Sequence, residues 1–484
     1  MNSIVERVFK YAEETPDNIA VIIENEVVSY SELWNAIVRL AHLFKKLGLR
    51  DGDRVVCQCK YDLYFIASIY ATGLCNAAAV PADKDVSDES IRNLAEQIDA
   101  RLVICNHKDE GNQNTVIYEE LSDILPDDTS MEGLSFPDMD SVETILFTTG
   151  TTGTPKGVQI TQRNASARTI SRLHELNLST WNSCITTVPL NHVAPITVLE
   201  RYLYCGGTMI FLNGIIKIGK MFEYIEKYAV NSIYLPPSGI SLLQKLAKEK
   251  LAEYSNQLKF FTTGSAAMTA SQQEYIKKML PKTRLYSSYG SSEVGVASLY
   301  RYDIYKKGIN CCGKPCKGME IKIVDDELQS VKTGQIGLIA IKSESVMKGY
   351  YNLPDLNREV LKDGYFISND LGYLDEEGLL YVCGRKDDMI NIGGLKVYPS
   401  EIENATLRIP GIIDCICFGV PDPVTGHKVK LLVQTDGSSM ITAEHVQDSL
   451  SHVMDYYKVP KIIEFVSEIA KTANGKPDRK FYQQ

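Results

Sequence analysis

Strands and helices alternate along most of the chain up to residue 290, and this alternation constrains the fold more than any other feature. Residues 29–49 carry apolar side chains on one helical face, with Ser29 and Glu32 as a capping box and Gly48 where a helix would stop. Strand-like and buried helical segments then follow one another from 53 to 106 and again from 206 to 290. Such alternation predicts parallel sheets with helices on their faces.

After this region the alternation of strands and helices gives way to other patterns. Residues 314–381 form short β segments separated by Gly-containing turns, and the last hundred residues mix helix and strand. We therefore predict a large N-terminal α/β domain over residues 1–386, with parallel-sheet subdomains and a small β subdomain. A smaller α+β domain is predicted over residues 387–484. A chain of 484 residues is long enough to need such a division.

Charge and hydropathy exclude several classes of partner. The formal net charge is -10, and no basic block stands out, which disfavours nucleic acid. No apolar run is long enough to predict a transmembrane segment. The N-terminal residues lack the apolar region of a signal peptide, so we expect a cytoplasmic protein.

The 12 cysteines are scattered along the chain. Their local clusters are Cys57 with Cys59, Cys415 with Cys417, and Cys311 with Cys312 and Cys316. The two pairs have the spacing of small buried residues on one face of a strand. No histidine lies near the third cluster, so a metal site there is the weaker alternative.

A stretch rich in glycine and threonine, LFTTGTTGTPKGVQI, occupies residues 146–160. Glycine permits close backbone approach to a ligand, successive amides can form an anion nest, and threonine hydroxyls add donors. Lys156 would supply a positive charge. A Walker A loop is excluded because Pro155 precedes this lysine and Gly157 follows it. The stretch predicts a phosphate loop of another kind, and a flexible surface turn is the alternative.

Residues 148–157 match the pattern [ST]-[ST]-G-[ST]-T-G-x-P-K-G at every fixed position, and at this point the chain resembles the adenylate-forming family of acyl-CoA synthetases, adenylation domains and luciferases. Three further segments resemble that family in its own order. They are YGSSEVG at 289–295, the segment 368–388 that ends in GRKDD, and KTANGKPDR at 471–479. The resemblance therefore covers nearly the whole chain.

The resemblance implies which residues bind ATP. Tyr289 would stack on adenine, Asp370 would bind the ribose hydroxyls, and Arg385 would hold ribose or phosphate. The full set implied for ATP and AMP is Thr148, Thr149, Gly150, Thr151, Gly153, Gly264, Ser265, Ala266, Ser288, Tyr289, Gly290, Ser292, Asp370 and Arg385. Three positions depart from the family pattern. Ser292 stands in place of threonine, Asn369 in place of glycine, and Ser287 where an amide side chain often reaches the adenine amino group.

The catalytic set implied by the resemblance is Lys476, Glu293, Thr152 and Lys156. Glu293 would hold Mg²⁺ on the ATP phosphates. Lys476 would point into the adenylating site, although a lysine near a chain end is usually solvated. Asp387 would be a hinge between two domains. An exposed, self-paired charge run is the alternative for residues 385–388.

The implied reaction has two halves. A carboxylate attacks the α-phosphate of ATP and releases pyrophosphate, and a thiol then attacks the acyl-AMP. The implied cofactors are ATP, Mg²⁺ and coenzyme A. Gly393 and Gly394 would lie beside the pantetheine, but a simple strand turn explains them equally well. Lys396 would meet a coenzyme A phosphate or remain solvated.

The acid is predicted from a few pocket positions. Val193 aligns where amino-acid-activating domains carry an aspartate for the α-ammonium, and a valine cannot pair that charge. An α-amino acid is therefore disfavoured. With His192, Ala194 and Ser238, this position predicts a largely uncharged pocket for an acyl or aryl acid.

Two other functions stay open on the sequence. One is a free-standing enzyme that loads the acyl group onto the phosphopantetheine of an acyl carrier protein. The other is a non-catalytic nucleotide-binding protein that has kept the fold, against which the presence of Glu293, Arg385 and Lys476 argues. A small-molecule carboxylic acid with coenzyme A is the leading prediction.

Overall fold

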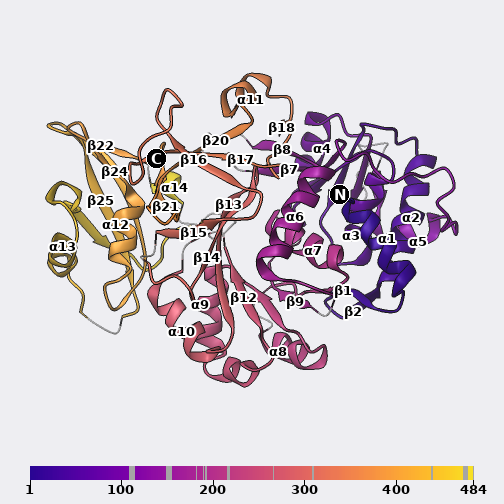
Figure 1. Cartoon of the computed structure of the whole chain (residues 1–484), viewed down its shortest axis with the longest axis horizontal. Helices are drawn as coiled ribbons and strands as arrows, with labels where there is room; N and C mark the ends of the chain where they lie inside the picture. Colours follow the sequence, from indigo (N-terminus) through magenta and orange to yellow (C-terminus); the bar gives the residue numbers. More distant parts are fainter. Residues whose placement is uncertain are drawn as a thin grey trace.

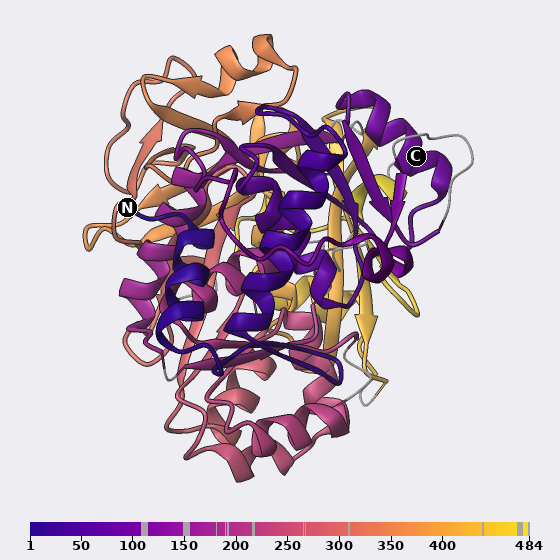
Figure 2. The ribbon, with the colours of Figure 1, turned by 90° about the vertical axis from the view of Figure 1, so that its right-hand side faces the viewer.

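The computed structural model describes residues 1–107, 115–148, 155–180, 182–188, 190, 193–214, 218–264, 266, 268–307, 310–437, 440–471 and 478–482. Figure 1 shows a large body that holds the N-terminal and middle elements, with a smaller body of C-terminal elements beside it. Figure 2 views the large body from the side of its N-terminal helices.

The first sheet of the large body has seven strands. In spatial order they are β18 (Gly349–Tyr350), β8 (Lys156–Thr161), β7 (Val142–Thr148), β4 (Ala78–Ala82), β3 (Arg54–Gln58), β5 (Leu102–Cys105) and β6 (Thr115–Ile117). The strands from β7 to β6 are parallel, whereas β8 and β18 join antiparallel at one edge. Helices α2 (Tyr30–Lys46) and α3 (Leu63–Gly73) pack on one face and α4 (Asp88–Gln97) on the other.

The second sheet has 14 strands and a parallel centre. That centre consists of β13 (Arg284–Ser291), β12 (Phe260–Thr263), β11 (Ser232–Tyr234), β9 (Ser183–Thr186), β10 (Thr208–Phe211) and β1 (Ile19–Ile23), with β2 (Glu26–Ser29) antiparallel at the edge. One face is covered by α8 (Ile218–Lys227), α9 (Pro237–Leu246) and α10 (Ala270–Met279). The other face is covered by α1 (Ile4–Glu14) and α7 (Val193–Cys205), which packs against α6 (Gln162–Leu176).

One hydrophobic core joins the two sheets. It includes Leu33 of α2, Phe65 of α3, Leu199 of α7 and Phe211 of β10, all buried. Helices therefore lie between the two sheets as well as outside them (Figure 1). This is the arrangement that the alternation of strands and helices predicted.

The short strands after residue 294 continue the second sheet. They are β14 (Gly295–Arg301), β15 (Cys311–Pro315), β21 (Leu380–Arg385), β20 (Tyr365–Leu374), β17 (Gly337–Lys342) and β16 (Glu320–Val324), with β19 (Leu361–Lys362) beside β20. The predicted small β region is present. Its strands are linked to the parallel centre because Ser298 and Leu299 of β14 pair with Pro315 and Lys314 of β15. The helix α11 (Pro354–Val360) precedes β19.

The C-terminal elements have a separate core. A three-stranded sheet is formed by β24 (Ile412–Asp422), β25 (Gly426–Thr435) and β26 (Ile462–Phe465), next to a hairpin of β22 (Ile390–Ile392) and β23 (Leu395–Val397). The helices are α12 (Pro399–Thr406), α13 (Ala443–Ser451) and the short α14 (Arg479–Tyr482). One buried cluster falls between Ile390 and Val459, and a second contains Ile416, Phe418, Leu432 and Ile469. The boundary predicted at 386 and 387 lies between β21 and β22.

Local signals in the sequence account for several element ends. The hydroxyl of Ser29 accepts a hydrogen bond from the Glu32 amide, and the Glu32 carboxylate accepts one from the Ser29 amide, which completes the predicted capping box of α2. Gly48 follows that helix with a φ of 85°, a conformation that favours glycine.

The cysteines are free thiols, and both predicted pairs are buried. In the described part of the chain, no group of cysteine, histidine and acidic residues could hold a metal ion, the cluster at Cys311, Cys312 and Cys316 included. Nor do the described residues include a helix long and apolar enough to cross a membrane.

Candidate active site

The predicted phosphate loop lies in sequence between β7 and β8, two strands that pair antiparallel. Thr148 at the end of β7 pairs with Lys156 at the start of β8, and the Thr148 hydroxyl donates to the Lys156 carbonyl at 3.5 Å. Residues 149–154 lie outside the described residues; they include Thr149, Gly150, Thr151, Thr152 and Gly153. The Lys156 ammonium lies 5.5 Å from the ring centroid of Tyr350, in cation–π range.

A second hairpin, β13 to β14, carries Tyr289 and Glu293. Gly290 pairs with Val296 there, and a Cβ on Gly290 would lie 1.9 Å from the Gly295 carbonyl oxygen. Only glycine permits this close approach, because any side chain would push the two strands apart. The hairpin therefore holds Tyr289 and Glu293 at opposite ends of one tight turn.

Tyr289 belongs to a cluster with Asp370 and Arg385. Its hydroxyl donates to Asp370 Oδ2 at 2.7 Å. Asp370 on β20 pairs in register with Arg385 on β21, and Arg385 Nε lies 4.0 Å from Asp370 Oδ1. Burial, and then the Asp370 charge, raises the pKa of Tyr289 well above its ordinary value, so the phenol stays a donor. The structure thus brings together the three residues predicted for the nucleoside.

The predicted residues nearest this cluster come from adjacent strands. Ser288 lies beside Tyr289 on β13 and donates from its hydroxyl to the Thr263 carbonyl at 2.9 Å. Gly264 follows β12, and a Cβ there would meet the Ser288 hydroxyl at 2.5 Å. Ala266 is exposed just beyond, and Ser265 lies outside the described residues. The end of β12 therefore approaches β13 closely only because residue 264 is glycine.

Glu293 has a partner that sequence reasoning missed. Tyr350 is buried and donates its phenol proton to Glu293 Oε1 at 2.8 Å. Burial, and then Glu293, raises the pKa of Tyr350 far above its ordinary value. Since the same ring faces Lys156, one tyrosine contacts both the predicted cation ligand and the loop lysine. In the sequence, Tyr350 is the first tyrosine of KGYYN. This short motif does not indicate a role at the site unless the fold is known.

The residues 345–351, which we call the connecting segment, join the two hairpins. On one side the Ser345 hydroxyl donates to the Val294 carbonyl at 2.9 Å, and the Met347 amide donates to the Glu293 carbonyl at 2.7 Å. On the other side the amides of Lys348 and Tyr351 donate to carbonyls of β8 at 2.9 and 2.7 Å. The connecting segment therefore fixes the Glu293 turn of one sheet against the Lys156 strand of the other.

The side chain of Arg168 on α6 binds the same turn. Its Nη2 donates to the Ser292 carbonyl at 3.0 Å and its Nε to the Ser345 carbonyl at 2.9 Å. The side chain is 4% exposed. A Cβ on Gly295 would lie 2.9 Å from the Arg168 side chain, so the turn rests directly on it. Ser292 is held in this turn through its carbonyl, and its contact with the nucleotide stays a prediction.

The predicted acid pocket is described only in part. Val193 and Ala194 begin α7, but their side chains lie outside the described part of the structure. His192 lies outside it altogether. Ser238 lies in the first turn of α9 and is exposed. Since most of its predicted lining lies outside the described residues, the pocket stays a prediction.

The predicted hinge and thiol residues lie around the start of the C-terminal elements. Asn369 donates from its side chain to the exposed carboxylate of Asp387. Gly393 and Gly394, with φ of 59° and 92°, form the turn between β22 and β23, as in a tight hairpin. That turn explains the glycine pair locally, and Lys396 is exposed on β23. Asn369 is the sequence neighbour of Asp370 in the nucleoside cluster.

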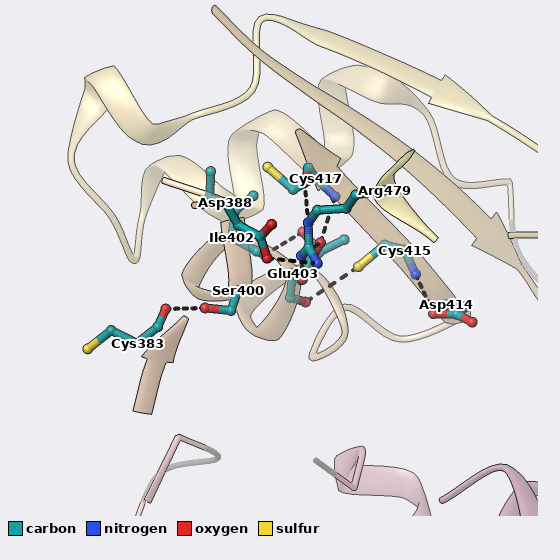
Figure 3. Close-up of polar contacts among 10 residues, drawn as sticks. Cys383, Asp388, Ser400, Ile402, Glu403, Asp414, Cys415, Cys417 and Arg479 are labelled. Atoms are coloured by element: carbon teal, nitrogen blue, oxygen red, sulfur yellow. Dashed lines mark hydrogen bonds and ion pairs between the residues drawn. The ribbon is translucent and has the colours of Figure 1, made fainter. Parts of the chain in front are cut away.

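Lys476 lies outside the described residues, but the structure describes the anchor that follows it (Figure 3). Arg479 Nη2 contacts Glu403 Oε1 and Oε2 at 2.5 and 2.6 Å, and its Nε donates to the Cys417 carbonyl at 3.2 Å. Glu403 also accepts from the Cys417 amide at 2.7 Å. This bidentate pair ties the terminal segment to α12 and β24.

Comparisons with known proteins agree with this architecture. A model of the family described as AMP-binding enzyme matches residues 8–351, and a model of the AMP-binding enzyme C-terminal domain matches 401–476. A feruloyl-CoA synthase of Amycolatopsis sp is 27% identical over 472 residues, which cover 96% of this chain and 95% of that protein. A 2-succinylbenzoate–CoA ligase of Oceanobacillus iheyensis is 29% identical over 475 residues, 96% of each chain.

Two solved structures share the fold. ATP-bound MatB from Rhodopseudomonas palustris superposes with a TM-score of 0.90 at 22% identity, over 100% of this chain and 98% of that one. The o-succinylbenzoate coenzyme A synthetase MenE from Bacillus subtilis, in complex with ATP and magnesium ion, gives 0.87 at 23% identity over 99% of each chain.

The fold and the two hairpins define an adenylate-forming enzyme. The chain belongs to the AMP-binding enzyme family, whose model covers more than half of it. The predicted family, fold class and enzyme class, an AMP-forming acid–thiol ligase, are confirmed.

Proposed function

We propose that this chain joins an aromatic or other non-amino carboxylic acid to coenzyme A, with ATP cleaved to AMP and pyrophosphate. The observation that carries the proposal is the β13–β14 hairpin. It presents Tyr289, bonded to Asp370, at one end and Glu293, bonded to Tyr350, at the other. A partner for the nucleoside and a ligand for a phosphate-bound cation thus share one rigid turn.

The acid class draws support from the relatives. One is named for feruloyl-CoA and the other for 2-succinylbenzoate, and both names denote aromatic acids. Val193 at the start of α7 agrees, because it offers no charge for an α-ammonium. Both names also specify coenzyme A, so we place coenzyme A ahead of an acyl carrier protein as the acceptor.

The residues present fit a magnesium ion with ATP. Glu293 uses Oε1 for the Tyr350 hydrogen bond, and the described residues give Oε2 no hydrogen bond. One or two carboxylates plus substrate phosphates are the usual ligands of Mg²⁺. The ion, when bound, neutralises charge on the phosphates. Tyr350 would keep the Glu293 carboxylate oriented, and Lys156, which lies near the same ring, would add a positive charge.

The chemistry then follows from alignment. A carboxylate oxygen of the acid forms a bond to the α-phosphorus as the bond to pyrophosphate breaks. Lys476, the loop from Thr148 to Lys156 and Glu293 would stabilise the charge that gathers on the phosphoryl oxygens. The sulfur of coenzyme A next forms a bond to the acyl carbon, the bond to AMP breaks, and the thiol proton passes to solvent.

We also propose that residues 387–484 move as a unit about Asp387 between these two steps. A separate hydrophobic core in the C-terminal elements supports this unit, and the Arg479 anchor would keep the Lys476 segment attached to it.

The free thiols suit a reducing compartment, so we assign the protein to the cytoplasm.

The first experiment measures acid-dependent pyrophosphate release with magnesium-ATP and hydroxylamine, over a panel of aryl, fatty and amino acids. We expect release and hydroxamate formation with aryl or acyl acids, and thioester when coenzyme A replaces hydroxylamine. Nucleotide binding without acid-dependent pyrophosphate would instead identify a non-catalytic nucleotide-binding protein. Release of ADP would exclude adenylation.

Lys476→Ala tests the catalytic lysine. We expect pyrophosphate release to fall by roughly 10²-fold or more, the scale of losing one preorganised charge partner. Lys471→Ala is the matched control, since Lys471 lies in the same segment and pairs with Asp414 at 2.8 Å. An unchanged rate in Lys476→Ala would remove Lys476 from the mechanism.

A further inference from the structure

The buried side chain of Arg168 binds two backbone carbonyls from different parts of the candidate site. Its Nη2 donates to the carbonyl of Ser292, the residue before Glu293, at 3.0 Å. Its Nε donates to the carbonyl of Ser345, which begins the connecting segment, at 2.9 Å. Because the guanidinium is planar and its donors are rigidly spaced, one side chain fixes the two carbonyls relative to each other.

The two carbonyls lie on the chain segments that carry Glu293 and Tyr350. Tyr350 follows Ser345 by five residues in the connecting segment, and its hydroxyl donates to Glu293 Oε1 at 2.8 Å. The Met347 amide, between them in sequence, donates to the Glu293 carbonyl at 2.7 Å. Arg168 therefore holds both the backbone of the proposed cation ligand and the segment that supplies the hydrogen-bond partner of that ligand.

Helix α6 makes further contacts with the same region. A Cβ on Gly295 would lie 2.9 Å from Cγ of Arg168 and 3.0 Å from its Cδ, so the aliphatic part of the arginine packs against the turn. One helical turn earlier, the side-chain amide of Asn164 donates to the Glu344 carbonyl at 2.7 Å. Arg168 thus acts from a helix that is itself bonded to the start of the connecting segment.

The charge of Arg168 also acts on Glu293. Burial lowers the pKa of Arg168 to about 10, and the nearby carboxyl groups of Glu200, Glu293 and Glu143 raise it, so the guanidinium stays positive at pH 7. A positive charge near Glu293 disfavours a bound cation, whereas a fixed Glu293 carboxylate favours one. The two effects of Arg168 on cation binding have opposite signs and can be separated by experiment.

We propose that Arg168 is a positioning residue for Mg²⁺, because it keeps the Glu293 turn and the connecting segment in the arrangement that binds the ion. This inference rests on the proposed function and adds a residue outside the set that the sequence implied. Groups that orient a metal ligand without touching the metal typically contribute about 10- to 100-fold to metal affinity or activity. Arg168 has this relation to Glu293, through the backbone on one side and through Tyr350 on the other.

The first test measures the dissociation constant of ATP by calorimetry, with magnesium and with EDTA, in the absence of any acid. Magnesium should tighten ATP binding by the wild type. In Arg168→Met this gain should be about tenfold or more smaller, while binding in EDTA stays unchanged. Arg163→Met is the matched control, since Arg163 lies on α6 and pairs with Asp140 at 2.9 Å near the surface.

Arg168→Lys separates position from charge. Lysine keeps the positive charge, but its ammonium cannot reproduce the two rigidly spaced donors of the guanidinium. We therefore expect Arg168→Lys to lose most of the gain from magnesium as well, and this variant decides the question if Arg168→Met does not fold. Tighter magnesium-ATP binding by Arg168→Met, with wild-type binding by Arg168→Lys, would show that only the charge acts and would overturn the proposal.

The second test follows pyrophosphate release as magnesium is varied. Both Arg168 variants should need about 10- to 100-fold more magnesium for half-maximal rate, with the KM for the acid unchanged. An equal loss of rate at every magnesium concentration, or weaker ATP binding in EDTA and magnesium alike, would show a merely structural role and overturn the assignment. If no acid is activated, the proposed function fails, and the ATP titrations still decide the role of Arg168.

Discussion

Tyr350 has two neighbours of opposite charge. Its hydroxyl donates to Glu293 at 2.8 Å, and its ring faces the Lys156 ammonium at 5.5 Å. The phenol is buried, so water does not replace either contact. At the scale of one residue, this tyrosine therefore sets the spacing between the proposed cation ligand and the proposed phosphate lysine.

We expect Tyr350→Phe to lower kcat/KM for pyrophosphate release by about 10- to 100-fold and to raise the magnesium concentration that the enzyme requires. A hydrogen bond to a charged group contributes about 1.5–3 kcal/mol, which corresponds to that range. Tyr351→Phe is the control, because the hydroxyl of Tyr351 donates to the Ile98 carbonyl at 3.0 Å, away from Glu293. A Tyr350→Phe enzyme with wild-type kinetics and magnesium dependence would contradict this role.

Glu200 gives the stability of the protein a dependence on pH. Burial raises the pKa of Glu200 from the ordinary 4.5 to about 8. The charged groups that face it are Arg168 on α6, Arg201 on α7 and Glu143 on β7. Between about pH 5 and pH 8 the folded state keeps this carboxyl group protonated, whereas the unfolded chain does not. The free energy of unfolding therefore falls as the pH rises through that range.

Glu200→Gln should flatten this part of the profile and raise the urea midpoint at pH 8 relative to the wild type. The expected change in slope is up to ~1.4 kcal/mol per pH unit, the value for one proton. Urea unfolding at a series of pH values measures it, with the exposed Glu274→Gln on α10 as control. Parallel profiles for wild type and Glu200→Gln would rule the group out as the source.

At the scale of elements, the β13–β14 hairpin depends on a close approach between its strands. The carbonyl of Gly295 occupies the place where a side chain on Gly290 would begin. Regular features of such elements were predictable: the capping box of α2 and the strand that carries Tyr289 both follow from local patterns. The connecting segment was not, because its hydrogen bonds join residues far apart in sequence and leave no periodic pattern.

Gly290→Ala should open the hairpin. The new Cβ would lie 1.9 Å from a backbone oxygen, and relief of such overpacking costs typically about 1–3 kcal/mol. We expect a lower Tm and a fall in pyrophosphate release of at least about tenfold. Gly219→Ala on α8 is the control, because nothing lies within 4 Å of its Cβ. Similar Tm values and rates for the two variants would contradict the close approach.

At the scale of the whole molecule, the parallel sheets and the C-terminal α+β elements were predictable because strand and helix patterns are local. The union of the β region with the second sheet was not, since it depends on the β14–β15 pairing, which composition does not encode. The burial of Arg168 beneath the Glu293 turn was missed for a similar reason. An arginine within a helical sequence is expected at the surface, and only packing reveals its burial.

Asp387→Pro tests whether the C-terminal unit moves about this residue. Proline fixes φ near −65°, so the chain can no longer rotate freely there. We expect one half-reaction to fall by about tenfold or more and the other to stay near the wild-type rate. Pyrophosphate release reports the first half, and AMP release from synthetic acyl-AMP with coenzyme A reports the second. Asp387→Ala is the control, and equal loss of both halves in the proline variant would contradict a hinge.

The connecting segment also determines when the site can form during synthesis. The strand β18 completes the first sheet, yet it comes from residues 349–350, after the whole parallel centre of the second sheet has been made. Until the ribosome has released that strand, Lys156 and Glu293 have no common partner. Long-range pairings of this kind form late. ATP binding should therefore appear abruptly in nascent chains, at the length at which the two sheets can pack together.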